Sequence, residues 1–214
     1  MKHRLALIAL LFSCTVPAFA QPSQPADPEA AYLQVVQERA DKIVATLGLT
    51  DAERKTRVRD LIARQYRDLR AIHDPRDAAI KVAKAKSGDD KPAAEQAIKA
   101  ARDHAGQQLA QLHTNFLAKL SQELTPAQVD EVKDGLTYGV VNVTYNAYMK
   151  MYPDLNAEQK AQIKSWLVEA REIAMDQGSS REKHAVFGKY KGRINNYLSR
   201  AGYDLKKAEA NLRK

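Results

Sequence analysis

Three stretches of the chain repeat one pattern that marks the beginning of an α-helix. In each, a leucine precedes Thr or Asn, and Glu or Gln follows three positions later: Leu49–Glu53, Leu124–Gln128 and Leu155–Gln159. The Thr or Asn side chain accepts a hydrogen bond from the backbone N–H three residues on, and the Glu or Gln side chain accepts one from the cap residue. The pattern therefore predicts helices that begin after the N-caps Thr50, Thr125 and Asn156.

Apolar residues recur at helical spacing along the chain. Val36, Ala40, Ile43 and Leu47 form one such stripe, as expected for one face of a helix with about 3.6 residues per turn. No segment alternates with a period of two, and the β-branched run 140–144 stands alone. Because a single strand has nothing to pair with, we interpret this run as an extended joint between helices. The sequence predicts an all-α fold, a compact bundle of six to seven helices.

Proline and glycine are placed where helices would begin and end. Asp74-Pro75 and Thr125-Pro126 put a capping side chain before a proline, which is tolerated at the first helical position. Four glycines each follow a helical stretch, where a left-handed residue commonly closes the last turn. They are Gly48, Gly88, Gly178 and Gly202.

Residues 77–108 alternate lysines with alanines around a polar break at 87–91. Alanine-rich helices bury little apolar area, so we predict that this part is an antiparallel helical hairpin projecting from the bundle. Its charges form either a solvated surface or a docking arm.

The first 20 residues have the three parts of a secretory signal. Lys2 and Arg4 precede an apolar run at residues 5–12, and Ala18 and Ala20 form a small-x-small cleavage site. We expect cleavage after Ala20, a flexible leader at 21–28 and one helical domain at 29–214, in the periplasm or secreted.

The only cysteine, Cys14, lies within this signal. It leaves open the alternative of a lipoprotein junction there. In either case no disulfide forms within the mature chain.

Motifs for common enzyme chemistries and for metal or cofactor sites are absent. There is no Gly-x-Ser-x-Gly, no His-Glu-x-x-His and no phosphate-binding glycine loop. The nearest polar constellation is His73, Asp74 and Asp77, for which a catalytic or ligand role is the alternative to a helix cap at Asp74. We therefore expect no cofactor and no metal, and we do not expect an enzyme.

Charge points to anionic partners. Lys and Arg outnumber Asp and Glu by 34 to 26, giving a formal net charge of +8. The basic residues are dispersed and an exported protein rarely meets nucleic acid, so nucleic-acid binding is not expected. Acidic glycans, lipid headgroups or cell-wall polymers would be attracted.

The stretch 187–198 combines glycines with polar and basic residues on one predicted helix. Gly188, Gly192 and Asn195 share one arc of the helix, and Lys189, Arg193 and Asn196 share the next. A glycine inside a helix costs about 1 kcal/mol relative to alanine, which suggests that the space is used. Either another helix backbone packs there, or a flat polar ligand is bound by Asn195 and Asn196 beside Lys189 or Arg193.

Seven of the nine tyrosines follow residue 137. They either pack at a helix rim or form an aromatic platform for a ligand. In the second case Tyr138, Asn142 and Tyr145 extend the candidate site.

The segments 71–77, 137–145 and 188–198 resemble a family of secreted bacterial proteins, domain of unknown function 3826. The resemblance covers about residues 32–205, and the last segment is the most specific. Where the family pattern often has proline, this chain has Asn142. The family's provisional sugar-binding label implies association with carbohydrate and supplies no catalytic residues. A weaker resemblance connects the Leu-Thr-x-x-Gln pattern at 124–128 with periplasmic helical stress chaperones.

Three functional hypotheses follow. The first is an exported, non-enzymatic binding protein for carbohydrate or acidic glycan, with a candidate site at Lys189, Arg193, Asn195, Asn196, Tyr138, Asn142 and Tyr145. The second is a periplasmic helical chaperone or adaptor that binds protein clients. The third is a polysaccharide-processing enzyme that uses His73, Asp74 and Asp77.

Overall fold

Eight helices form the part of the protein that the structure, a computed structural model, describes: residues 27–86, 88 and 90–209. The predicted signal peptide at 1–20, including Cys14, and the leader up to residue 26 lie outside this part. No strand occurs in it, so the predicted all-α class is confirmed. The helices are α1 (Pro28–Thr46), α2 (Ala52–Ala85), α3 (Lys91–Glu123), α4 (Pro126–Leu136), α5 (Val140–Met151), α6 (Ala157–Ala174), α7 (Ser180–Arg200) and α8 (Leu205–Glu209).

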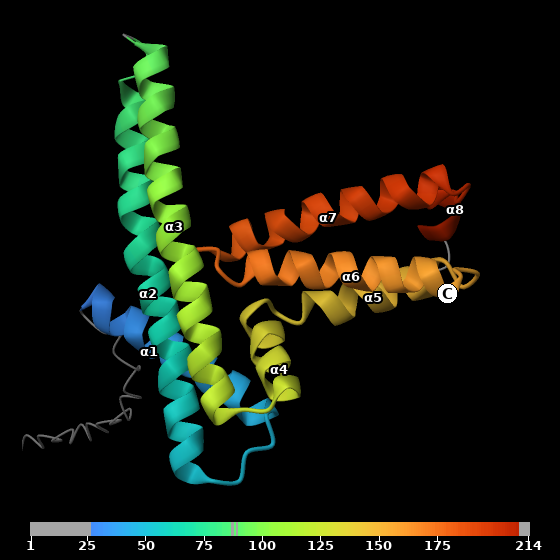
Figure 1. Ribbon diagram of the computed structural model, residues 1–214, viewed down its shortest axis with the longest axis horizontal. Helices are drawn as coiled ribbons and strands as arrows, with labels where there is room; N and C mark the ends of the chain where they lie inside the picture. The colour runs from blue at the N-terminus through green and yellow to red at the C-terminus, as the bar shows by residue number, and fades with distance from the viewer. Residues whose placement is uncertain (1–26, 87, 89, 210–214) are drawn as a thin grey trace, which may run out of the picture.

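The helices form two groups that meet at one junction (Figure 1). α2 and α3 run antiparallel as a long hairpin, with α1 and α4 packed near its lower end. α5, α6 and α7 extend sideways from the hairpin, and we call them the side arm. The upper part of the hairpin projects beyond this junction, and it includes the predicted arm at 77–108.

Each group has its own hydrophobic core. The first core joins α1, α2, α3 and α4, and its most buried side chains include Val58, Ile62, Leu120, Val132 and Leu136. The second core joins α5, α6 and α7 through Ile163, Leu167, Phe187, Ile194 and Leu198. Met175 directly follows α6 yet is fully buried in the first core. The end of α6 therefore anchors the side arm to the hairpin.

Two of the three predicted capping boxes are confirmed. The Thr125 hydroxyl accepts the Gln128 N–H at 3.3 Å, and Gln128 Oε1 accepts the Thr125 N–H at 3.1 Å. Asn156 and Gln159 make the same reciprocal pair at 2.8 and 3.0 Å. The leucines before both caps are buried, as expected of a staple.

The third cap was predicted one residue too early. Asp51, not Thr50, caps α2, and its Oδ1 accepts the N–H groups of Glu53 at 2.8 Å and Arg54 at 3.1 Å. A carboxylate bonds two N–H groups here and also interacts favourably with the positive end of the helix dipole. At α1, Asp27 is the cap, so that helix begins with the last residue of the predicted leader.

Pro75 does not begin a helix, and that prediction was wrong. It lies inside α2, which continues unbroken to Ala85. Asp74 caps nothing; its carboxylate accepts from Arg70 Nε at 3.2 Å. An interior proline costs about 3 kcal/mol, but α2 runs alongside α3 and buries Leu69 and His73 before the proline and Ala83 after it. This packing keeps the helix continuous.

The predicted extended joint at 140–144 is also wrong, because these residues form the start of α5. The chain instead turns at Tyr138 and Gly139, which have φ angles of 60° and 65°. Val141 is buried in the second core, so packing overrides the β-preference of the run.

Only two of the four glycines predicted to end helices, Gly48 and Gly202, have left-handed φ angles. None of the helices in the described residues is both long and apolar enough to cross a membrane.

The cap of α2 provides a first prediction. Asp51→Ala should lower the free energy of unfolding by about 1 kcal/mol, because two backbone N–H groups lose their acceptor. Thr50→Ala should change it by less than about 0.5 kcal/mol, since Thr50 is an exposed residue outside the cap. Urea unfolding followed by circular dichroism measures both, and a larger effect at Thr50 would contradict the observed cap.

Candidate binding site at the junction of hairpin and side arm

Polar side chains connect the side arm to the hairpin and to α4. Asp176 contacts two histidines. Its backbone carbonyl accepts a hydrogen bond from His73 Nε2 at 2.7 Å, and its side-chain Oδ2 lies 2.7 Å from His113 Nδ1. Lys183 Nζ donates to the carbonyl of Leu136, the last residue of α4, at 2.8 Å. The loop between α6 and α7 is thereby fixed against α2, α3 and α4.

Gly178 allows this loop to approach α2 closely. A Cβ atom placed on Gly178 would lie 2.8 Å from Cγ and 2.9 Å from Cδ2 of the His73 ring. The glycine was predicted to close a helix in the left-handed region, but its φ is not in that region. Contact with a buried histidine is the reason for glycine here.

A cleft of about 190 Å³ lies at this junction. Side chains from α1, α2, the 138–139 turn, the α6–α7 loop and the first turn of α7 line it. Those used below are Tyr32, Arg39, Tyr66, Arg70, Tyr138 and Lys183.

Lys183 is a buried cation of this cleft. The side chain is only 4% exposed, and Nζ lies 5.5 Å from the centre of the Tyr66 ring and 5.9 Å from that of Tyr138. Among the described residues, no carboxylate comes within 4.0 Å of Nζ. Desolvation, followed by repulsion from Arg39, lowers the pKa of Lys183 to about 8, and Asp176 opposes this in part.

Arg39 is a second cation of the cleft and, unlike Lys183, is exposed to solvent. Its guanidinium lies 5.8 Å from the centre of the Tyr66 ring, and within the described part of the chain it forms no ion pair. Arg70 differs, since Glu29 at 2.9 Å and Asp74 at 3.2 Å balance its charge. Positive charge at the cleft therefore comes from Arg39 and Lys183.

Two tyrosines add hydroxyl groups and ring faces. Burial raises the pKa of Tyr66 to about 12, and its hydroxyl has no hydrogen-bond partner in the described structure. Tyr138 is 46% exposed, and its ring stacks on His184 with centroids 5.7 Å apart. It is the only non-glycine residue with positive φ among the described residues, a conformation that concentrates at functional sites.

The cleft brings together three of the residues selected from sequence. Tyr138, His73 and Asp74 all line it. His73 is 3% exposed; Nε2 is bonded to Asp176, and Nδ1 is buried without a partner in the described structure. Asp77 lies apart, paired with Arg76 at 2.7 Å.

The remaining candidates lie elsewhere and are bonded among themselves or to neighbours. Asn142 donates to Asp134 Oδ2 at 3.2 Å and accepts from Lys164 at 3.1 Å, and Lys164 also lies over the Tyr145 ring. Asn195 Oδ1 accepts from the buried Tyr148 hydroxyl at 2.7 Å.

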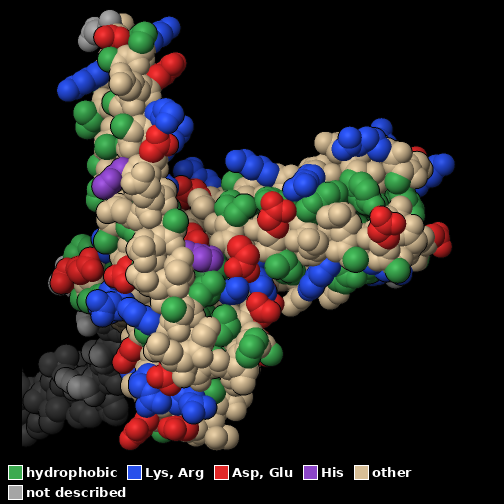
Figure 2. Space-filling view, in the orientation of Figure 1, with side chains coloured by type: hydrophobic (Ala, Val, Ile, Leu, Met, Phe, Trp, Pro, Cys, Tyr) green, Lys and Arg blue, Asp and Glu red, His purple; other side chains and the backbone are tan. Residues whose placement is uncertain are grey.

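Lys189 and Asn196 are exposed, and Arg193 lies over Trp166 at 4.5 Å and 3.5 Å from Glu169. Basic side chains are spread along the outer edge of the side arm, where α7 lies (Figure 2). None of these residues lines the cleft.

Gly188 and Gly192 face open space. A Cβ at either glycine would have no atom within 4 Å beyond its own helix and neighbours. The interpretation that another helix backbone packs against them is therefore wrong. Neither glycine lines the cleft at the junction.

Sequence reasoning missed Arg39, Tyr66 and Lys183. One signal was available for Lys183, because it precedes Phe187, Tyr190 and Ile194 by 4, 7 and 11 positions, in register with the apolar face of the helix. A lysine in an apolar stripe is a buried cation or an error in the assignment. Arg39 and Tyr66 carry no comparable signal, since only the packing of α1 on α2 brings them together.

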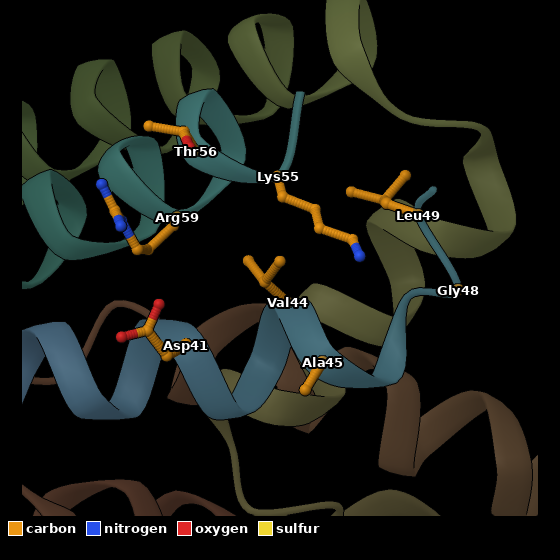
Figure 3. A pocket seen from close by; sticks show the side chains of 8 residues that line it. All are labelled: Asp41, Val44, Ala45, Gly48, Leu49, Lys55, Thr56 and Arg59. Atoms are coloured by element: carbon orange, nitrogen blue, oxygen red, sulfur yellow. The ribbon is translucent and has the colours of Figure 1, made fainter. Parts of the chain in front are cut away.

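A second hollow, of about 300 Å³, lies between α1 and the first turns of α2 (Figure 3). Asp41 and Arg59 stand on its two walls, and Lys55 extends into the space between them. Its charged side chains are solvent-accessible, and Arg59 is paired with Asp60 at 2.8 Å. This hollow contains no buried polar group that would call for a ligand, unlike the cleft at Lys183.

Comparison with known proteins identifies the family. Residues 33–214 match the family described as Protein of unknown function (DUF3826), and the chain belongs to that family. No curated protein matches the chain. Within the described residues, no group of three or more His, Cys, Asp or Glu side chains could hold a metal ion.

Gly178→Ala tests the close contact with His73. We expect a loss of about 1–3 kcal/mol in the free energy of unfolding, because the added methyl overlaps a ring that cannot move away cheaply. Gly192→Ala is the matched control and should stabilise α7 by about 0.4–1 kcal/mol. Chemical unfolding measures both, and equal effects would contradict the geometry.

The pKa of Lys183 predicts a dependence of stability on pH. The folded-state pKa of about 8 lies below the ordinary lysine value of 10.5, so the unfolded chain binds more protons between these values. Stability relative to Lys183→Met should therefore rise from pH 8 to pH 10.5, by on the order of 3 kcal/mol. Below pH 8 the difference should be constant. Parallel urea titrations across this range measure it, and a flat difference throughout would show that Lys183 is not desolvated.

Proposed function

We propose that the protein is an exported, non-enzymatic binding protein for an acidic carbohydrate, which it binds in the cleft at Lys183. The observation that carries the proposal is the pair of cations, Arg39 and Lys183, beside one tyrosine ring without a carboxylate partner. A buried ammonium is costly unless it is paired. A bound carboxylate would supply the missing negative charge, with the planar guanidinium of Arg39 as a bidentate partner.

The tyrosines account for the carbohydrate part of the ligand. An aromatic ring can stack on the apolar face of a pyranose while its hydroxyl stays polar. Tyr138 offers an exposed ring, and Tyr66 offers a hydroxyl that no described residue bonds. The cleft of about 190 Å³ is smaller than the range of about 300–1,000 Å³ for sites that enclose drug-sized ligands. One sugar ring is the size of ligand that we expect.

The two other hypotheses have less support. A chaperone needs a broad apolar surface, but the exposed large apolar residues of the described chain are spread over five helices and the 138–139 turn: Leu33, Val35, Val82, Tyr138, Val143, Ile173 and Leu205. An enzyme built on His73, Asp74 and Asp77 would use side chains that already serve Asp176, Arg70 and Arg76. The two cations without an ion pair, Arg39 and Lys183, favour binding of an acidic ligand.

Galacturonic acid and galactose test the proposal as a matched pair, because they differ only in the carboxylate. In calorimetry at low salt, the acid should bind at least about tenfold tighter than the neutral sugar, since a charged hydrogen bond contributes about 1.5–3 kcal/mol. Arg39→Gln should abolish this preference. Lys189→Gln removes the same charge on the exposed face of α7 and should keep it.

A wider panel of acidic and neutral oligosaccharides covers other ring types. If no acid on the panel binds more tightly than its neutral counterpart, the proposal fails. Equal losses in Arg39→Gln and Lys189→Gln would show attraction by net charge alone.

A further inference from the structure

The Lys183 amine can do more than attract an acid. Lys183 lines the cleft, its nitrogen lies 5.5 and 5.9 Å from the centres of the Tyr66 and Tyr138 rings, and Arg39 is close enough to repel it. A lysine desolvated in an apolar pocket or beside another cation is the arrangement that makes the amine a nucleophile toward carbonyl groups. Binding of a carboxylate alone leaves this property unused.

We propose that Lys183 Nζ forms a reversible imine with the carbonyl carbon of a carboxylic acid that also carries an aldehyde or ketone. The ligand class is an oxo acid, which includes the open-chain form of a uronic acid. The inference rests on the proposed function, because it uses the same cleft and the same recognition of a carboxylate by Arg39.

The step is balanced without a further reactant. The nitrogen lone pair attacks the carbonyl carbon, the C=O π electrons move to oxygen, and one N–H proton moves to that oxygen to give a carbinolamine. The C–O bond then breaks, the remaining N–H proton leaves with the hydroxide as water, and the C=N double bond forms. Hydrolysis reverses both steps and releases the ligand unchanged.

One hydrogen bond positions the amine, and a second cation lies near it. The Leu136 carbonyl, 2.8 Å from Nζ, engages one N–H bond and so restricts rotation of the nitrogen. Arg39 and Lys183 lie 5.8 and 5.5 Å from the centre of the same Tyr66 ring. Both side chains line the same cleft, so an acid bound there would meet both cations.

The protonation state agrees with this role. With a pKa of about 8, about one Lys183 side chain in ten is uncharged at pH 7, whereas a lysine with an ordinary pKa is uncharged in fewer than about one in a thousand. Only the uncharged amine has the lone pair that attacks carbon.

Reductive trapping tests the inference on the full chain. Pyruvate, the probe, is added with sodium cyanoborohydride, which reduces an imine to a stable secondary amine, and peptide mass spectrometry locates the adduct. We expect one carboxyethyl adduct, on Lys183, at least about tenfold above any other lysine at low pyruvate. Lys183→Arg should abolish it, and Lys189→Arg, the matched control on the same helix, should retain it.

Two further measurements distinguish a site that recognises the carboxylate from a lysine that reacts with any carbonyl compound. Arg39→Gln should slow trapping of pyruvate at least about tenfold more than trapping of acetaldehyde, because pyruvate loses one charged hydrogen bond. Acetaldehyde has no carboxylate, so its trapping should slow only as far as the loss of Arg39 raises the pKa of Lys183. With cyanoborohydride in large excess, so that attack by the amine limits the rate, the trapping rate should rise with pH up to about 8, as Lys183 becomes neutral.

The adduct can be mapped on the wild-type protein alone, so the test remains valid even if Lys183→Arg does not fold. Adducts spread over exposed lysines, or none on Lys183, would overturn the inference. If galacturonic acid still binds with a preference over galactose while Lys183 is not trapped, imine formation is wrong and the proposed function stands. If the acid shows no preference and no adduct forms, both are wrong.

Discussion

The contact between the α6–α7 loop and α2 holds the two halves of this protein together. The missing side chain of Gly178 lets the loop reach the His73 ring, and the Asp176 carbonyl then meets His73 Nε2. Met175, the preceding residue, enters the hairpin's core. With a side chain at position 178, the loop would have to move away from α2. The cleft at Lys183 lies on this contact and would change shape with it.

The junction contains two buried cations in opposite electrostatic situations. Arg171, 5% exposed, lies 2.6 Å from Asp130 and 2.9 Å from Asp134, so its charge is compensated by α4. Lys183, 4% exposed, has a backbone carbonyl as its acceptor and a second cation, Arg39, nearby. The first arrangement fixes the side arm to α4. The second leaves a desolvated positive charge that an anion would stabilise, which is why the functional proposal is centred there.

α7 serves several purposes along one helix. Phe187, Ile194 and Leu198 fill the second core, and Lys183 reaches the cleft from the first turn. The opposite face, with Lys189 and the two glycines, is exposed to solvent. Sequence reasoning selected this exposed face because glycine is unfavourable in a helix and suggested a use for the space. The glycines instead face open solvent, and the structure gives no account of their presence.

Local signals in the sequence determined the helical class, the capping boxes at Thr125 and Asn156 and the turn that forms the projecting hairpin, because caps and periodicity act over a few residues. They misplaced the start near Pro75 and the run at 140–144, where packing against distant helices outweighs local preference. They selected Tyr138, His73 and Asp74, which line the cleft, but none of the cations Arg39 and Lys183 or the Tyr66 ring beside them. Arg39, Tyr66 and Lys183 lie on three different helices, α1, α2 and α7. Only tertiary packing sets the distances between them and the desolvation of Lys183. The pKa of Lys183 and the absence of an ion partner depend on this separation and desolvation, so only the tertiary structure could reveal the cleft as a candidate site.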